Sequence, residues 1–241
     1  PQGITHVPFN DVAALEASIS ENTCAVIIEP IQGESGILPA TQEYLQAARR
    51  LCDEHGALLI LDEVQTGMGH TGKLFAYEHY GITPDILSSA KALGGGFPVG
   101  AILTTDKIAP TFGPGTHGST FGGNPMACAV GSRAFDIINT PETLAHVEKQ
   151  GQKLQTTLRE LGEKTGVFKE VRGMGLLIGC VLADKYKGRA SEITAAALKH
   201  GLMVLVAGAD VVRFAPSLLL NDEDMAEGLK RLEAALTEWI V

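Results

Sequence analysis

The sequence lacks an excess of positive charge, a long apolar run and a signal peptide, and each absence excludes a class of protein. Its formal net charge is −9, which argues against nucleic-acid binding because that function needs a basic face. No apolar run reaches the roughly 20 residues that a membrane-spanning helix requires. The first residues do not have the pattern of a signal peptide. Together these absences favour a cytoplasmic protein.

Cysteines are few and show no pairing pattern. The four are Cys24, Cys52, Cys128 and Cys180, and no C-x-x-C spacing indicates a metal site or a redox pair. Three of them lie in apolar or helical contexts, so we expect buried, free thiols. No metal site is predicted.

The first half of the chain has the pattern of an α/β protein. Of the 241 residues, 45% are hydrophobic and 20% are charged, as in packed globular proteins. Strands are expected at residues 24–29, 57–61, 85–89 and 99–104. A helix is expected at 41–54, with Thr41 as N-cap and Gly56 beyond its end, and Asn124 with Pro125 should begin another. The run 57–61 is apolar throughout, which predicts a strand buried on both faces of a parallel sheet.

The second half has a different pattern. A long amphipathic helix is expected at residues 142–165, followed by strands near 167–171, 176–182, 204–206 and 211–214. Helices near 191–200 and 222–240 complete an α+β arrangement. We therefore predict two domains, 1–140 and 141–241, with a boundary near Pro141.

Asp62 ends the most apolar of the expected strands. Ligand sites in open α/β sheets lie outside the carboxyl ends of strands, and a carboxylate there is costly unless a cation meets it. The protonated ring nitrogen of a ligand would be such a cation, and an aspartate that only caps the next turn is the alternative. The run DEVQTG from Asp62 to Gly67 favours a site, because it places an acid, an apolar contact and an amide close together.

Lys91 follows the expected strand 85–89 and precedes a run of glycines. Partial burial would lower the pKa of this lysine and favour the neutral amine that forms imines. The glycines would let the backbone approach a bound ring or phosphate closely. A surface lysine before a flexible loop is the alternative.

A second glycine-rich run, residues 116–125, leads into a helix start, where hydroxyls and free N–H groups suit a phosphate.

Two other motifs are incomplete. Residues 67–73 follow the phosphate-binding loop of NTPases, but Leu74 stands where a serine or threonine is needed for Mg²⁺. Residues 88–91 and 164–166 mimic two β-lactamase motifs, but no Ser-Asp-Asn lies between them. We predict neither function.

Four ordered motifs resemble those of the class III aminotransferases. They are EPIQGE at residues 29–34, LDEVQTG at 61–67, SAKALGGG at 89–96 and GSTFGGNP at 118–125. The similarity extends to RGMGL at 172–176 and VRFAP at 212–216, and it is closest to members that act on N-acetylornithine. It implies the PLP-dependent transferase fold type I, here part of the large, mostly parallel-sheet domain followed by a smaller C-terminal α+β domain. His70 and Ser35 depart from the family pattern, which usually has Arg and Gly there.

The resemblance implies a pyridoxal 5'-phosphate cofactor. Lys91 would hold it covalently, and Asp62 would pair with its ring nitrogen. Val64 would pack on a ring face, and Gln65 would reach the ring hydroxyl. The implied cofactor-binding residues are Asp62, Glu63, Val64, Gln65, Lys91 and Thr120.

Other implied roles concern a homodimer and the substrates. Thr120 would bind the cofactor phosphate across a dimer interface, and Ser119 would lie beside the substrate. Arg213 would bind a substrate carboxylate, and Glu34 would pair with Arg213 when the other substrate is present. This pair is expected to join the two domains.

The implied reaction transfers the terminal amino group of N-acetylornithine to 2-oxoglutarate, in arginine biosynthesis, giving N-acetylglutamate semialdehyde and glutamate. Succinylornithine, ornithine and succinyl-diaminopimelate stay open as donors, as does a class III mutase or decarboxylase. In the family, an N-terminal part that this chain does not match supplies a phosphate-binding loop, a ring-stacking aromatic residue and a substrate-binding arginine. A non-catalytic fragment with half the site is therefore a further alternative.

Overall fold

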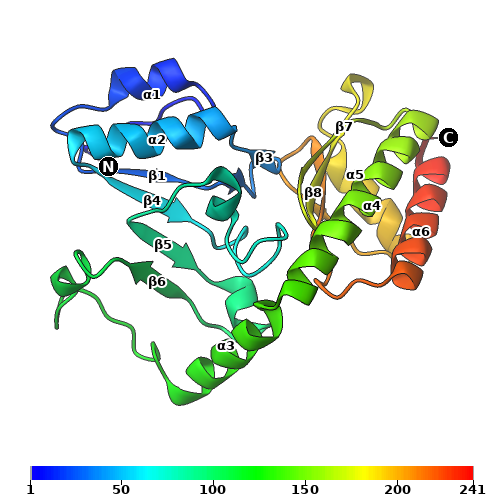
Figure 1. Cartoon of the computed structure of the whole chain (residues 1–241). Coiled ribbons are helices and arrows are strands. Elements are labelled where there is room, and N and C mark those ends of the chain that lie inside the picture. Colours follow the sequence, from blue (N-terminus) through cyan, green and yellow to red (C-terminus); the bar gives the residue numbers. More distant parts are fainter. Residues whose placement is uncertain (1, 241) are drawn as a thin grey trace. The chain divides into compact units, whose positions relative to one another are not determined.

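The computed structural model describes residues 2–240, and the chain divides into two compact units (Figure 1). The first unit consists of the chain up to Pro30, Ala40–Met68 and Phe75–Ile137. The second consists of Ile31–Pro39, Gly69–Leu74 and the chain from Ile138 onward. Two short segments that precede the predicted boundary therefore pack with the second unit.

The first unit is built on a four-stranded sheet in the order β1-β4-β5-β6. β1 (Ala25–Ile28), β4 (Leu58–Asp62) and β5 (Ile86–Ser89) run parallel, and β6 (Ala101–Thr104) pairs antiparallel with β5. These strands confirm the four that were expected from the sequence. The parallel order brings the carboxyl ends of β4 and β5 to the same edge of the sheet.

Helix α2 (Gln42–His55) covers one face of this sheet (Figure 1). The side chain of Thr41 accepts a hydrogen bond from the backbone N–H of Tyr44, and Gly56 ends the helix in the left-handed conformation. Both signals are the predicted ones. The helix packs on β1 and β4, where Leu59 and Leu61 are fully buried.

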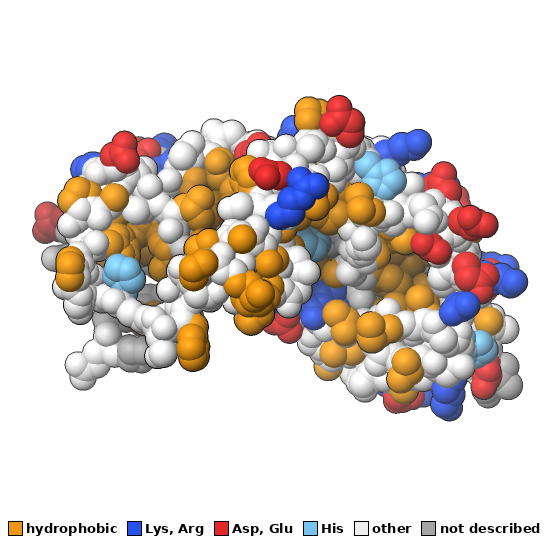
Figure 2. All heavy atoms as spheres, turned by 90° about the horizontal axis from the view of Figure 1, so that it is seen from below, with side chains coloured by type: hydrophobic (Ala, Val, Ile, Leu, Met, Phe, Trp, Pro, Cys, Tyr) orange, Lys and Arg blue, Asp and Glu red, His pale blue; other side chains and the backbone are white. Residues whose placement is uncertain are grey.

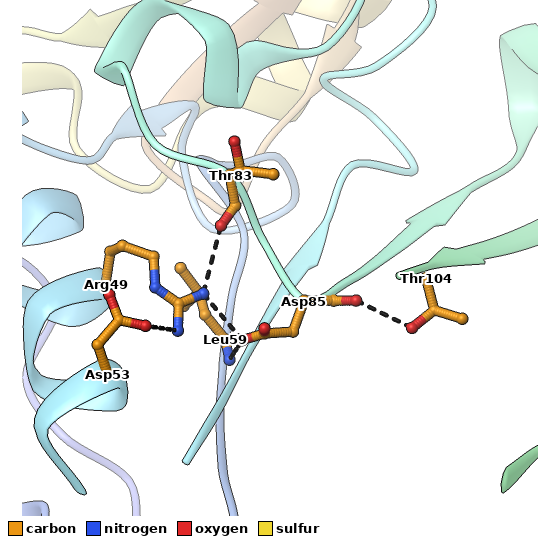
Figure 3. Close-up of polar contacts among 6 residues, drawn as sticks. All are labelled: Arg49, Asp53, Leu59, Thr83, Asp85 and Thr104. Atoms are coloured by element: carbon orange, nitrogen blue, oxygen red, sulfur yellow. Dashed lines mark hydrogen bonds and ion pairs between the residues drawn. The ribbon is translucent and has the colours of Figure 1, made fainter. Parts of the chain in front are cut away.

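Asp85 ties three strands of the first unit to helix α2, as Figure 3 shows. Its Oδ2 accepts hydrogen bonds from Arg49 Nη1 at 2.8 Å and from the backbone N–H of Leu59 at 2.7 Å. The hydroxyl of Thr104 on β6 donates to the backbone carbonyl of Asp85 at 3.0 Å. This network lies at the amino end of β5 and fixes the sheet on the side away from its carboxyl edge.

The remaining elements of the first unit are short or lie at its periphery. Asn124 Oδ1 accepts from the backbone N–H of Ala127 at 2.9 Å, which confirms the predicted start of the helix at Pro125. These elements are α1 (Val12–Ser18), the 3-10 helices η1 (Ala76–Tyr80), η2 (Lys91–Gly94) and η3 (Ala109–Thr111), and α3 (Pro125–Ile138).

The first unit leaves much apolar surface uncovered. Ile27 on β1 is 69% exposed and Ile102 on β6 is 64% exposed, and in β4 Ile60 is only partly buried. Apolar side chains are visible across the face of this unit in Figure 2. The predicted burial of strand 57–61 on both faces is therefore incomplete within the chain.

The second unit is an antiparallel sheet packed against helices. Its strand order is β7-β8-β10-β9, with β7 (Phe168–Met174), β8 (Leu177–Leu182), β9 (Leu205–Val206) and β10 (Val211–Phe214). The helices are α4 (Pro141–Thr165), α5 (Ala190–Lys199) and α6 (Asp222–Ile240), with the 3-10 turn η4 (Asp184–Tyr186). Every residue of β8 is buried. A hairpin of β2 (Ile31–Gln32) and β3 (Leu38–Pro39), which the sequence did not reveal, contacts β7.

The cysteines differ in exposure. Cys52 and Cys180 are buried, and burial raises the pKa of both thiols, that of Cys52 to about 11. Cys24 and Cys128 are exposed, so the expectation of buried thiols is wrong for these two. Among the described helices, none is long and apolar enough to cross a membrane.

Candidate active site

Two predicted site residues lie at the carboxyl edge of the first sheet. Asp62 is the last residue of β4, and Ser88 lies beside it in the parallel register of β5. β5 ends at Ser89, and Lys91 begins η2. Because this edge is where open α/β sheets bind ligands, Asp62 and Lys91 are placed where the sequence predicted a site.

The carboxylate of Asp62 is held through one of its oxygens. Oδ1 accepts hydrogen bonds from Ser88 Oγ at 2.9 Å and from the backbone N–H of Val64 at 3.0 Å. Within residues 2–240, no group donates to Oδ2, and the residue is only partly buried. The site therefore offers an oriented anionic oxygen, which suits a cationic N–H group.

Lys91 combines an exposed side chain with an unusual backbone. Its φ is 49°, in the left-handed region that residues other than glycine seldom adopt. Such a conformation costs about 1 kcal/mol or more and is found preferentially at functional sites. The partial burial that was expected for Lys91 is wrong, because its side chain is exposed in the chain.

Glu63 is fully buried, with 0% exposure. One carboxylate oxygen accepts from Thr66 Oγ1 at 2.7 Å and from the backbone N–H of Ala76 at 2.8 Å, and the other accepts from the backbone N–H of Tyr77 at 2.8 Å. Burial raises the pKa of Glu63, and these hydrogen bonds offset part of that effect. These hydrogen bonds join the turn after Asp62 to the start of η1, and a contact of Glu63 with a cofactor stays a prediction.

The other predicted cofactor residues lie in two segments of the first unit. Val64 and Gln65 follow Asp62 in a turn and are half-buried. Ser119 and Thr120 lie in an exposed loop ahead of α3, beside Phe121, which is 80% exposed. This loop presents its hydroxyls to the surface.

Glu34 and Arg213 form an ion pair within the second unit. Arg213 Nη1 lies 2.7 Å from Glu34 Oε1 and also donates to the backbone carbonyl of Gly33 at 3.3 Å. The Arg213 side chain is 13% exposed and that of Glu34 is 70% exposed. The predicted pairing is confirmed, but the expectation that it joins two domains is wrong, because both residues belong to one unit.

The turn that carries Glu34 is held by a second arginine. Nε and Nη2 of Arg172 donate to the backbone carbonyl of Gly36, at 3.0 and 2.8 Å. Gly36 has a φ of 110°, and a Cβ added there would lie 2.8 Å from Arg172 Nη2. A glycine is therefore required at this position, and the backbone beside Glu34 is fixed.

Sequence reasoning missed Ser88 and Arg172 as supports of the site. Ser88 was noticed only as part of an incomplete motif, because its role depends on the pairing register of β4 with β5. Arg172 entered only as part of the run RGMGL that resembles the family, because its partner Gly36 is distant along the chain. A correct prediction of which strands are neighbours would have found Ser88.

Comparisons with known proteins give a consistent result. The model of the family described as aminotransferase class-III matches residues 4–236. The chain is 83% identical over 239 residues to the acetylornithine aminotransferase of Neisseria meningitidis serogroup B, covering 99% of this chain and 60% of that protein. It is 58% identical over 239 residues to a Pseudomonas aeruginosa protein named succinylornithine transaminase/acetylornithine aminotransferase, covering 99% of this chain and 59% of that protein.

A solved structure shows the same fold. The crystal structure of N-acetylornithine aminotransferase from Stenotrophomonas maltophilia matches with a TM-score of 0.92 at 45% identity, over 100% of this chain and 64% of that one. The chain spans about 60% of the length of the curated relatives that it matches.

Proposed function

The chain belongs to the class III aminotransferases, and on this basis we propose that the protein carrying it transfers the terminal amino group of N-acetylornithine to 2-oxoglutarate with pyridoxal 5'-phosphate as cofactor. The products are N-acetylglutamate semialdehyde and glutamate. Support for this donor comes from the names of similar proteins. The joint name of the Pseudomonas aeruginosa relative keeps succinylornithine as a second candidate.

The observation that carries the proposal is that Asp62 and Lys91 both lie at the carboxyl edge of the first sheet. Its residues fit the cofactor, because two donors hold one oxygen of Asp62 while none among the described residues binds the other, and because Lys91 offers an exposed amine. When bound, pyridoxal phosphate supplies a conjugated, electron-withdrawing ring next to the reacting carbon. Asp62 Oδ2 would accept a hydrogen bond from the protonated ring nitrogen and hold the proton there.

Lys91 is the proposed base of the reaction. Its Nζ would take the proton from the substrate carbon that bears the donor amine and hold it for the later return step. Val64 and Gln65, in the turn after Asp62, would orient the ring. Thr120 would bind the phosphate in a homodimer, and the loop that carries it is exposed.

Glu34 and Arg213 are proposed to let one site accept two different substrates. 2-Oxoglutarate brings a carboxylate that Arg213 would bind, whereas the reacting end of the donor carries no such group. A mostly buried arginine that faces no carboxylate is costly, so Glu34 would neutralise the charge of Arg213 in the donor half-reaction. Glu34 is the movable partner, because its side chain is 70% exposed and that of Arg213 is 13% exposed.

A panel of amine donors tests the proposed reaction. The protein carrying this chain would be incubated with 2-oxoglutarate and, in turn, N-acetylornithine, succinylornithine, ornithine and succinyl-diaminopimelate, and glutamate formation would be measured. We expect the highest kcat/KM with N-acetylornithine. Turnover of a donor without any 2-oxo acid would instead indicate a mutase or a decarboxylase. The homodimer and the cytoplasmic location stay predictions.

A further inference from the structure

We propose that Ser88 is a positioning residue, which orients the Asp62 carboxylate so that a single oxygen faces the cofactor. The inference rests on the proposed function in one respect, namely that Asp62 meets the ring nitrogen of pyridoxal phosphate. It adds a residue whose side chain acts through Asp62 and not on the substrate.

Ser88 is hydrogen-bonded to Asp62 and to the residue that follows it. The two residues are partners in the parallel register of β4 and β5, and Ser88 Oγ lies 2.9 Å from Asp62 Oδ1. The backbone carbonyl of Ser88 accepts from the N–H of Glu63 at 3.0 Å. Ser88 therefore holds both the side chain of Asp62 and the backbone that follows it.

Both donors to Asp62 act on the same oxygen. Oδ1 accepts from Ser88 Oγ and, at 3.0 Å, from the backbone N–H of Val64. In the described part of the chain, no donor binds Oδ2. The carboxylate torsion of aspartate is broad when nothing restrains it, so these two bonds select one orientation. With Oδ1 engaged in this way, Oδ2 is the oxygen that would face the ring nitrogen and accept a hydrogen bond from it.

The neighbouring serine provides a matched control. Ser89 is the next residue of β5, so its side chain points to the opposite face of the sheet. It is 2% exposed, and its Oγ is buried with no hydrogen-bond partner within residues 2–240. Ser89→Ala therefore removes a hydroxyl from the same strand without removing a bond to Asp62.

The decisive comparison is between Ser88→Thr and Ser88→Val in the protein carrying this chain. Threonine and valine have nearly the same shape, and only threonine can donate to Asp62. We expect kcat with N-acetylornithine to be roughly ten-fold lower in the valine variant than in the threonine variant, as for the loss of one hydrogen bond to a charged group. KM should change little. Ser88→Thr and Ser89→Ala should behave like the parent.

A second readout is independent of turnover. With pyridoxal phosphate labelled with ¹⁵N in the ring and bound to the protein, the ¹⁵N chemical shift reports whether the ring nitrogen is protonated. In Ser88→Val we expect a movement toward the unprotonated value, and in Ser88→Thr and Ser89→Ala we expect none.

Two outcomes would overturn the assignment. If the valine variant keeps the ¹⁵N shift and the kcat of the threonine variant while Asp62→Asn is impaired, Ser88 does not position Asp62, and the proposed function stands. An equal change in Ser88→Val and Ser89→Ala would show a general effect of strand packing and would also contradict the inference. If Asp62→Asn and Lys91→Ala are both fully active, the proposed function itself fails.

Discussion

Removal of the Glu34 side chain should change the two half-reactions of the proposed enzyme in opposite directions. In Glu34→Ala, a substrate carboxylate no longer competes with Glu34 for Arg213. We therefore expect tighter binding of 2-oxoglutarate and new activity toward donors with an α-carboxylate near the reacting amine. The half-reaction with N-acetylornithine should weaken, because Arg213 is then left without Glu34.

The size of the effect follows from the ion pair. Arg213 Nη1 and Glu34 Oε1 are 2.7 Å apart, but the Glu34 side chain is 70% exposed, so solvent screens much of the attraction. A pair of this kind is worth about 1 kcal/mol, which corresponds to roughly a five-fold change in an equilibrium constant. The apparent dissociation constant of 2-oxoglutarate should fall by about this factor.

Single-turnover measurements by rapid mixing would follow each half-reaction separately through the cofactor absorbance. Glu227→Ala is the matched control, because it breaks an ordinary ion pair of the same unit, between Glu227 Oε1 and Arg231 Nε at 2.8 Å on α6. We expect no difference between half-reactions in the control. Equal losses in both half-reactions of Glu34→Ala, together with a lower melting temperature, would refute the reasoning and leave only a structural salt bridge.

Three further predictions concern the first unit. Lys91→Ala should abolish covalent cofactor attachment and transamination, and borohydride reduction with peptide mapping should find the cofactor on Lys91 and not on Lys73 or Lys107. Asp62→Asn should retain cofactor but turn over roughly a thousand-fold more slowly, since a strong charged hydrogen bond is lost; near-normal turnover would contradict the role of its charge. For Glu63, burial raises the pKa in the folded state. Above the ordinary glutamate pKa, the folded state therefore keeps a proton that the unfolded chain has lost. The free energy of unfolding then falls as pH rises through the pKa of the folded state. Urea denaturation over about pH 4 to 8 should show this slope in the parent but not in Glu63→Gln.

Most of the elements could be predicted because their signals are local. Thr41 and Gly56 mark both ends of α2, and the apolar run before Asp62 marks β4. The mixed α/β fold expected from the resemblance is confirmed by the family match and by the solved structure from Stenotrophomonas maltophilia. Helix α1 was missed; its cap at Asp11, which accepts from the N–H of Ala14, was the available signal.

What could not be predicted depends on contacts between distant segments. The hairpin around Glu34 packs with the second unit through buried Ile31 and Ile37, and Arg172 binds the carbonyl of Gly36. No local sequence pattern indicates these distant partners. Similarly, the positions of Asp62 and Lys91 at strand ends could be read from the sequence, whereas the hydroxyl of Ser88 became meaningful only with the strand register.

The two hydrogen bonds from Arg172 to the carbonyl of Gly36 bear on how fast Glu34 can leave Arg213. Because they fix the turn that carries Glu34, release of Arg213 requires rotation of one exposed side chain and no rearrangement of the backbone. Such rotations take picoseconds to nanoseconds, whereas enzymes of ordinary speed turn over about 1 to 1,000 times per second. Rotation of the Glu34 side chain away from Arg213 would therefore not by itself limit the rate of the proposed reaction.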